Sequence, residues 1–192
     1  MSEQGTTLRP LTRKGTGLKD QHPVKVLQFG QGNFLRAFAD WIIDILNEKV
    51  NFNGAVQIVQ PIHKGMAGMI NAQEGLYHLV MNGLKNGSPS SETKLIRCVS
   101  SAIDPYTDLA AFLKAGENPE LQIVISNTTE AGITFDPADV SAEKLPNSFP
   151  GKVTMLLYHR YKYFRGAPDK GLTFLPCELI DKNGNALKAA VL

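Results

Sequence analysis

The fold is decided by one stretch, Val24-Lys25-Val26-Leu27-Gln28-Phe29-Gly30-Gln31-Gly32-Asn33-Phe34-Leu35-Arg36-Ala37-Phe38. Its first six residues are mostly apolar and predict a buried parallel strand, and its last five show the apolar spacing of a helix. Gly30 permits the tight turn between them, and Gly32 removes the side chain that would block a diphosphate. The N–H groups that open the helix then face that anion. The stretch therefore predicts a dinucleotide-binding βαβ unit whose cofactor-binding residues include Gly30, Gln31, Gly32, Asn33 and Phe34.

The glycine pattern departs from G-x-G-x-x-G at one position, because Leu35 stands in place of the third glycine. That glycine normally allows close packing of the helix on the strand. A glycine pair after a strand is also compatible with an ordinary strand–turn–helix connection that binds nothing. The order of strand, glycine turn and helix favours nucleotide binding over that alternative.

Composition bounds the class of protein. A chain of 192 residues with 43% hydrophobic and 20% charged residues is typical of one globular domain. A net charge of +2 does not favour a nucleic-acid partner. The cysteines and histidines lack metal-ligand spacing, so no metal site is predicted. The N-terminal stretch lacks the apolar segment of a signal peptide, and no apolar run is long enough to span a membrane. Two free thiols fit a reducing compartment. We therefore expect a cytoplasmic protein without a membrane partner.

The order of predicted elements indicates an α/β fold. After an N-terminal arm over residues 1–22, residues 23–192 are expected to form one NAD(P)-binding Rossmann domain. A helix over 33–49 and a strand over 55–60 complete the parallel unit. Two strand-like runs over 77–84 and 92–99 flank Asn-Gly and Pro-Ser, which predicts a hairpin. The expected fold is a Rossmann-like, doubly wound, mostly parallel sheet with an antiparallel hairpin insertion.

The second half of the chain continues this alternation. Asp104 is expected to cap a short helix over 106–115. Strands are expected over 121–126 and 171–176, with helices over 152–164 and from 186 onward. The last helical pattern has no C-terminal cap, so we expect the chain to be the front part of a longer protein.

Ligands of such a sheet collect beyond the carboxyl ends of its strands. After the second strand stands Gln60, where NAD-specific sites usually carry Asp or Glu. Its amide is a candidate to bind the adenosine ribose, while Lys64 or His63 is a candidate to meet a 2′-phosphate. The choice between NAD and NADP therefore stays open, and both basic residues also fit a solvated loop.

Two later strand ends carry polar side chains as well. Asn127 and Thr128 suit the nicotinamide ribose, and Glu130 is a candidate catalytic carboxylate that relays a proton. The same segment also fits an N-cap cluster. Glu178 follows the last strand as a second candidate catalytic carboxylate, or as a capping or ion-pair residue.

Three segments together resemble the mannitol dehydrogenase family, the polyol-specific long-chain dehydrogenases. They are 27–38 with Gly-x-Gly-x-Phe-x-Arg-Ala, 126–132 with Thr-x-Glu, and 175–187 with Pro-Cys-Glu and Asn-Gly. The resemblance spans about residues 24–192 and is greatest to the branch that interconverts D-tagaturonate and D-altronate in hexuronate catabolism. It implies an NAD-linked oxidoreductase with a sugar-acid substrate.

The resemblance also implies a helical C-terminal domain that carries the catalytic lysine in Lys-x-x-x-x-Asn-x-x-His. No Lys of this chain is followed five residues later by Asn, so that residue is expected outside it. By motif, the glycine turn would hold the diphosphate, Asn127 and Thr128 the ribose side, and Glu130 the proton path. Arg36 is a candidate for the substrate carboxylate.

One departure leaves the substrate open. Mannitol enzymes carry Asp-Asn where this chain has Glu178-Leu179, and Leu179 cannot donate a hydrogen bond to a developing alkoxide. Fructuronate or mannitol specificity, a non-catalytic dinucleotide-binding module and an S-adenosylmethionine-dependent methyltransferase remain as alternatives, the last fitting the hairpin poorly.

Overall fold

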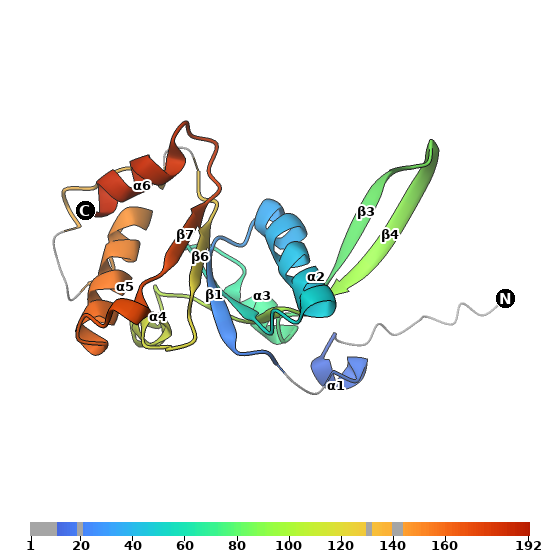
Figure 1. Ribbon diagram of the computed structural model, residues 1–192, viewed down its shortest axis with the longest axis horizontal. Coiled ribbons are helices and arrows are strands. Elements are labelled where there is room, and N and C mark those ends of the chain that lie inside the picture. Colours follow the sequence, from blue (N-terminus) through green and yellow to red (C-terminus); the bar gives the residue numbers. More distant parts are fainter. Residues whose placement is uncertain (1–10, 19–20, 130–131, 140–143) are drawn as a thin grey trace.

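A five-stranded sheet forms the centre of the protein in the computed structural model, which describes residues 11–18, 21–129, 132–139 and 144–192 (Figure 1). Its order is β5-β2-β1-β6-β7, and every neighbouring pair is parallel. The order reverses at β1, so the predicted Rossmann-like, doubly wound sheet is confirmed. The strands are β1 Val24–Phe29, β2 Ala55–Val59, β5 Val99–Ile103, β6 Ile123–Ser126 and β7 Thr173–Pro176.

Helices cover both faces of this sheet, because successive side chains of a strand point to opposite faces. Val26 of β1 packs into one core, and Leu27 and Phe29 pack into the other. Figure 1 shows α2 on one side of β1, with α4 and α5 on the opposite side. The helices of the first layer are η1 Leu35–Ala39, α2 Asp40–Val50 and α3 Ala67–Ala72, and those of the second are α4 Leu109–Gly116, α5 Phe149–Tyr163 and α6 Asn183–Val191.

The predicted antiparallel hairpin is confirmed as β3 Tyr77–Lys85 and β4 Ser88–Ile96, which project from the body of the molecule (Figure 1). The two residues between them, Asn86 and Gly87, have φ of 52° and 79°. Asn and Gly tolerate this left-handed conformation, and such a turn matches the twist of paired strands. The Asn-Gly signal in the sequence therefore placed the turn correctly.

The end of the hairpin was predicted wrongly. The expected second strand over 92–99 stops at Ile96, and Val99 begins the separate strand β5 beside β2. The polar side chains of β5 interrupt the apolar run by which the sequence would have predicted this strand. Ser100 Oγ donates to the carbonyl of Val56 at 3.1 Å, so β2 satisfies a hydroxyl that looks exposed in the sequence. The short helix α3 was also not predicted.

Helix boundaries differ from the predictions for local reasons. The helix expected to begin after Asp104 begins at Leu109, because Asp108 is its N-cap and accepts from the N–H of Ala111 at 2.8 Å. Asp104 instead accepts from the N–H of Tyr106 at 3.0 Å in the preceding turn. The last helix begins at Asn183 rather than at residue 186.

Two further short helices are α1 Arg13–Thr16 and the 3-10 helix η3 Pro168–Lys170. The first belongs to the predicted N-terminal arm, for which the sequence showed no periodicity. Arg13 holds it to the body, donating from Nη2 to the carbonyls of Arg97 at 2.9 Å and Val99 at 2.7 Å. Within the described ranges, no helix has both the length and the apolar character needed to cross a membrane.

Candidate functional site

A pocket of about 850 Å³ lies at the edge of the sheet where the parallel strands end. This is the position at which Rossmann-like sheets bind ligands. Segments that follow β1, β2 and β6 line it, together with the beginning of α5. Of the predicted cofactor-binding residues, the pocket lining brings together Gly30, Gln31, Gly32, Asn127 and Thr128.

The two glycines of the turn have different roles. Gly30 has φ of 133°, and a Cβ there would lie 2.8 Å from Leu35 Cδ1 and 3.3 Å from the carbonyl oxygen of Asn127. A Cβ on Gly32 would meet no described atom within 4 Å, and Gly32 lines the pocket. Gly30 is therefore required by the fold, whereas Gly32 leaves space for a ligand.

Helical backbone begins directly after Gly32, at Asn33. Within the described residues, no side chain caps the π-helix η1 that follows. A helix N-terminus of this kind attracts anions through its N–H groups and dipole. Asn33 and Phe34, both predicted to bind cofactor, are exposed here. Phe34 stacks on Phe38 with ring centroids 5.3 Å apart.

The side chain of Arg36 stabilises the glycine turn by two hydrogen bonds. Its Nε donates to the carbonyl of Gln31 and its Nη2 to Oδ1 of Asn33, both at 2.9 Å. The guanidinium also lies 5.6 Å from the centre of the Tyr77 ring. The side chain that was a candidate for the substrate carboxylate thus binds the glycine turn itself.

The loop after β2 is held by two inward-facing glutamines. Oε1 of Gln60, which is 3% exposed, accepts from the N–H of Ala67 at 3.3 Å. Gln31 accepts from the N–H of Met66. A Cβ on Gly65 would lie 2.3 Å from both glutamine side chains, so a larger residue there would displace their carboxamides. The carboxamide of Gln60 therefore holds its own loop, and its predicted ribose contact stays a prediction.

Glu178 ties the ends of β6 and β7 together. Its Oε1 accepts from the N–H and the Oγ1 of Thr128 at 3.0 and 3.1 Å, and its Oε2 accepts from Asn183 Nδ2 at 3.1 Å. Burial opposes ionisation, but these hydrogen bonds outweigh it and lower the pKa of Glu178. Asn127 strengthens the same junction by donating to the carbonyl of Cys177 at 2.7 Å.

The predicted catalytic roles are not tested by these contacts. Glu130 lies outside the described residues. Glu178 is described, and its contacts position the strand ends. The roles of both carboxylates in catalysis stay predictions.

Lys152 supports a pocket residue from the protein interior, and the sequence did not indicate this role. It is fully buried, and its Nζ donates to the carbonyl of Asn147, a pocket residue, at 2.6 Å. Burial lowers the pKa of Lys152 to about 8, against the opposing charge of Asp139. The ammonium lies 5.2 Å from the ring of Tyr106, whose hydroxyl donates to the carbonyl of Pro61 at 3.0 Å. A lysine in an amphipathic helix normally indicates a solvated face, so no local signal revealed it.

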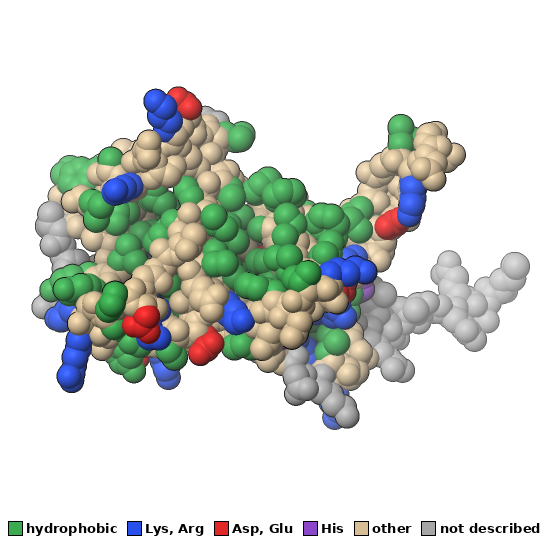
Figure 2. All heavy atoms as spheres, in the orientation of Figure 1, with side chains coloured by type: hydrophobic (Ala, Val, Ile, Leu, Met, Phe, Trp, Pro, Cys, Tyr) green, Lys and Arg blue, Asp and Glu red, His purple; other side chains and the backbone are tan. Residues whose placement is uncertain are grey.

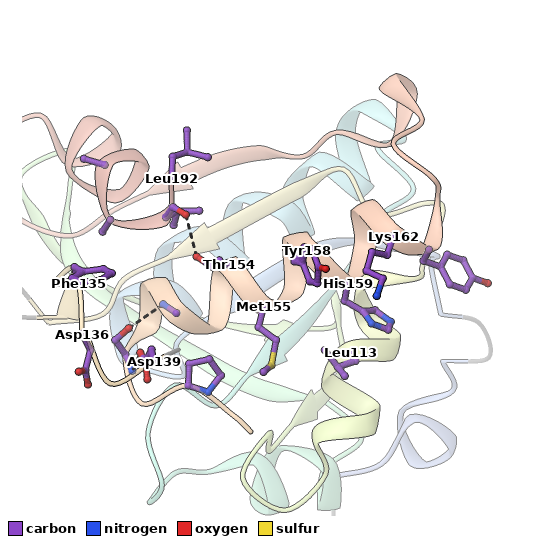
Figure 3. Close-up of a pocket in the computed structure, with 17 residues that line it drawn as sticks. Leu113, Phe135, Asp136, Asp139, Thr154, Met155, Tyr158, His159, Lys162 and Leu192 are labelled. Atoms are coloured by element: carbon purple, nitrogen blue, oxygen red, sulfur yellow. Dashed lines mark hydrogen bonds between the residues drawn. The ribbon is translucent and has the colours of Figure 1, made fainter. Parts of the chain in front are cut away.

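A second pocket of about 740 Å³ lies beside the first, between α5, the end of α6 and residues 135–139 (Figure 3). The two pockets share Phe135, Asp136 and Ser148. Oγ1 of Thr154 donates to the carbonyl of Val191 at 3.3 Å across this region (Figure 3). The segment around Phe135 therefore separates two neighbouring cavities.

The parallel sheet, the glycine turn at its switch point and the helix N-terminus beside the pocket define a Rossmann-type domain. Residues 24–192 match the family model described as the mannitol dehydrogenase Rossmann domain. The chain belongs to the mannitol dehydrogenase family, as the resemblance in the sequence predicted.

Curated relatives agree with this assignment. The chain is 52% identical over 178 residues to the altronate oxidoreductase of Phocaeicola vulgatus and 51% identical over 178 residues to that of Bacteroides thetaiotaomicron. Each alignment covers 93% of this chain but 37% of the relative. The chain thus spans little more than a third of the length of these relatives.

Two solved structures are similar in fold. A substrate-free D-sorbitol dehydrogenase superposes with a TM-score of 0.72 at 25% identity. The Pseudomonas fluorescens mannitol 2-dehydrogenase, in a ternary complex with NAD and D-mannitol, superposes with a TM-score of 0.73 at 19% identity. Both alignments cover 88% of this chain, and 37% and 36% of the respective structures.

Proposed function

We propose that this chain is the cofactor-binding domain of an NAD-dependent oxidoreductase that interconverts D-tagaturonate and D-altronate. The observation that carries the proposal is Gly32, which opens the pocket at a helix N-terminus. The altronate oxidoreductases at about half identity support the substrate, and the NAD complex of the fold relative supports the cofactor.

The residues present fit a dinucleotide. Gly32 lines the pocket, and a Cβ there would meet no described atom within 4 Å, so the backbone is accessible to a diphosphate. Gly30–Phe34 would hold the diphosphate, and Asn127 and Thr128 would lie on the nicotinamide side. When bound, NAD supplies the nicotinamide carbon that exchanges hydride with the sugar acid.

This chain's own contribution is to bind and orient. Arg36 keeps the glycine turn in place, and Glu178 keeps the ends of β6 and β7 together. The proton donor of the reduction is expected to be a lysine beyond this chain. We propose residues 23–192 as the domain and 1–22 as its arm. The cytoplasmic location is supported by two free cysteines, Cys98 and Cys177.

The remainder of the full-length protein is the partner that we propose for the exposed apolar surface near the turn. Figure 2 shows apolar side chains gathered over the region of α2. Phe34 and Phe38 of the adjoining segment are 45% and 52% exposed. Exposed aromatic side chains of this kind mark interaction surfaces.

The second candidate within the same class is fructuronate or mannitol specificity. Leu179 is 86% exposed and offers no side-chain hydrogen bond where mannitol enzymes carry Asn, so the donor to the substrate oxygen is not assigned to this position. A panel of these substrates on the full-length enzyme distinguishes the candidates.

The cofactor proposal is tested by calorimetric titration of the 192-residue protein with NADH, NADPH and S-adenosylmethionine. We expect NADH to bind and S-adenosylmethionine not to bind. The affinity for NADPH shows whether the site, whose lining includes Lys64, accommodates a 2′-phosphate. Failure of both NADH and NADPH to bind would overturn the proposal. Reduction of tagaturonate by this chain alone would refute the assignment of the proton donor to another domain.

A further inference from the structure

A buried polar cluster lies behind the glycine turn, between β1, the π-helix and the base of the hairpin. Its centre is Asp40, the first residue of α2, whose exposed fraction is 0%. Gln28 of β1, also 0% exposed, packs beside it. The hydroxyl of Tyr77, the first residue of β3, lies 2.8 Å from Oδ2 of Asp40. None of these residues lines the cofactor pocket within the described chain.

Two chains of contacts link Asp40 to the turn, and they are called the first and the second arm. In the first, Gln28 donates from Nε2 to the carbonyl of Gly30 at 3.2 Å. In the second, the Tyr77 hydroxyl lies 2.8 Å from the carbonyl of Arg36, whose side chain binds Gln31 and Asn33. Both arms end on the backbone or side chains of the residues expected to hold the diphosphate.

The π-helix explains why the second arm exists. A π-turn shifts the helical hydrogen bonds by one residue and leaves carbonyls in need of other donors. Tyr77 supplies such a donor to Arg36. Figure 1 shows the base of the hairpin beside α2, which is how β3 brings this hydroxyl to the helix.

We propose that Asp40 and Tyr77 are positioning residues that hold the Gly30–Asn33 turn in the geometry that receives the diphosphate, with Asp40 acting in its neutral, protonated form. The inference rests on the proposed function, since it assigns the regulation of that same site.

The acceptors around Asp40 outnumber the available donors, which supports the neutral form of its carboxyl group. Among the described residues, Oδ1 of Asp40 and Oε1 of Gln28 are buried acceptors without a hydrogen-bond partner. The Tyr77 hydroxyl has one proton but lies 2.8 Å from two acceptors, Oδ2 of Asp40 and the carbonyl of Arg36. A proton on Oδ2 of Asp40 donates to the Tyr77 oxygen and leaves the Tyr77 proton for the carbonyl of Arg36. An ionised Asp40 would instead attract the Gln28 amide N–H groups away from the carbonyl of Gly30, which would release the first arm.

The charged surroundings agree with this assignment. Burial raises the pKa of Asp40 to about 7, while Tyr77, Gln28 and Arg36 oppose the shift and Asp44 adds to it. Asp44 is itself near Lys94 and Arg97, at 3.6 and 3.5 Å. Cys98, whose Sγ donates to the carbonyl of Asp40 at 3.1 Å, has its pKa raised well above the usual value by burial.

The consequence is a cofactor affinity that falls as the pH rises through neutrality. Because binding favours the neutral form, NADH binding takes up a proton, and the dissociation constant increases by at most about tenfold per pH unit. We expect a rise of about threefold or more between pH 6 and pH 8.

The test is calorimetric titration of the wild-type chain with NADH at pH 6, 7 and 8, in two buffers of different ionisation enthalpy at pH 7. We expect proton uptake at pH 7 in the wild type. D40N carries a donor without a titratable group, so it should bind NADH with little dependence on pH and take up less proton. Y77F should weaken NADH binding severalfold at every pH. Y161F, at an exposed tyrosine away from the turn, is the matched control and should bind like the wild type.

The outcomes separate the two proposals. If the wild type binds neither NADH nor NADPH at any pH, the proposed function fails and takes this inference with it. If the wild type binds NADH without proton uptake or pH dependence, only this inference is overturned, whether or not D40N folds. An unchanged pH dependence in folded D40N would also overturn it.

Discussion

The two glycines of the turn should respond oppositely to the same substitution. Gly32→Ala adds a methyl group that meets no described atom within 4 Å, so the free energy of unfolding should change by less than about 0.5 kcal/mol. Gly32 lines the cofactor pocket, so the methyl group is added at the surface of that pocket. If it prevents one or two backbone N–H groups from reaching the diphosphate, each such bond to a charged group contributes about 1.5–3 kcal/mol. NADH should therefore bind at least about tenfold more weakly.

Gly30→Ala should instead destabilise the fold. Its φ of 133° is strained for any residue with a Cβ, which costs about 1–3 kcal/mol. The new Cβ would also lie 2.8 Å from Leu35 Cδ1, which can shift, and 3.3 Å from the backbone oxygen of Asn127, which is less able to. For a domain of this size, a loss of about 2 kcal/mol lowers Tm by roughly 4–8 °C.

Thermal unfolding and NADH calorimetry on the same samples separate these effects. Gly83→Ala is the matched control, since a Cβ at this hairpin glycine also meets nothing within 4 Å and the residue does not line the pocket. Wild-type NADH affinity in Gly32→Ala would refute the assignment of the open space to the diphosphate. A wild-type Tm in Gly30→Ala would refute the strain argument.

Three further substitutions test the contacts around the pocket, with urea unfolding as the measurement. Gly65→Ala should lower the free energy of unfolding by about 1–3 kcal/mol, because its Cβ would lie 2.3 Å from two glutamine side chains. Gly68→Ala in α3, where a Cβ meets open space, is the control and should be neutral or stabilising. Equal effects of the two substitutions would contradict the packing argument. Glu178→Gln should cost about 1–3 kcal/mol by mismatching the donors of Thr128 and Asn183, unlike a change at an exposed glutamate. Lys152→Met should remove a rise in wild-type stability between about pH 8 and pH 10, where the unfolded lysine holds a proton that the folded one releases; a persistent rise would exclude Lys152 as its source.

Much of the fold could be predicted because its signals are local. Apolar runs identified β1 and β2, the two glycines identified the turn, and Asn86-Gly87 identified the hairpin. Each of these signals depends on the conformational preference or the burial of neighbouring residues alone. The strand β5 was not predicted, because its serine hydroxyls bond to β2. Ser100 donates to the carbonyl of Val56, which lies 44 residues earlier in the chain.

The candidate site divides in the same way. The sequence placed Gly30, Gly32, Asn127 and Thr128 at strand ends, and parallel strands necessarily bring their ends to one edge of a sheet. It did not indicate which way a long polar side chain would turn. Gln60 faces its own loop rather than the pocket, which only the positions of Gly65 and Ala67 explain.

What the sequence determined by itself was the glycine turn, the alternation of strands and helices, and the family to which the chain belongs. Tertiary structure alone decided that Glu178 joins two strand ends, that Lys152 is buried, and that Asp40 and Tyr77 meet behind the turn. The physical reason is that backbone preference is a property of adjacent residues. The environment of a buried charge depends on partners that only packing brings within hydrogen-bond distance.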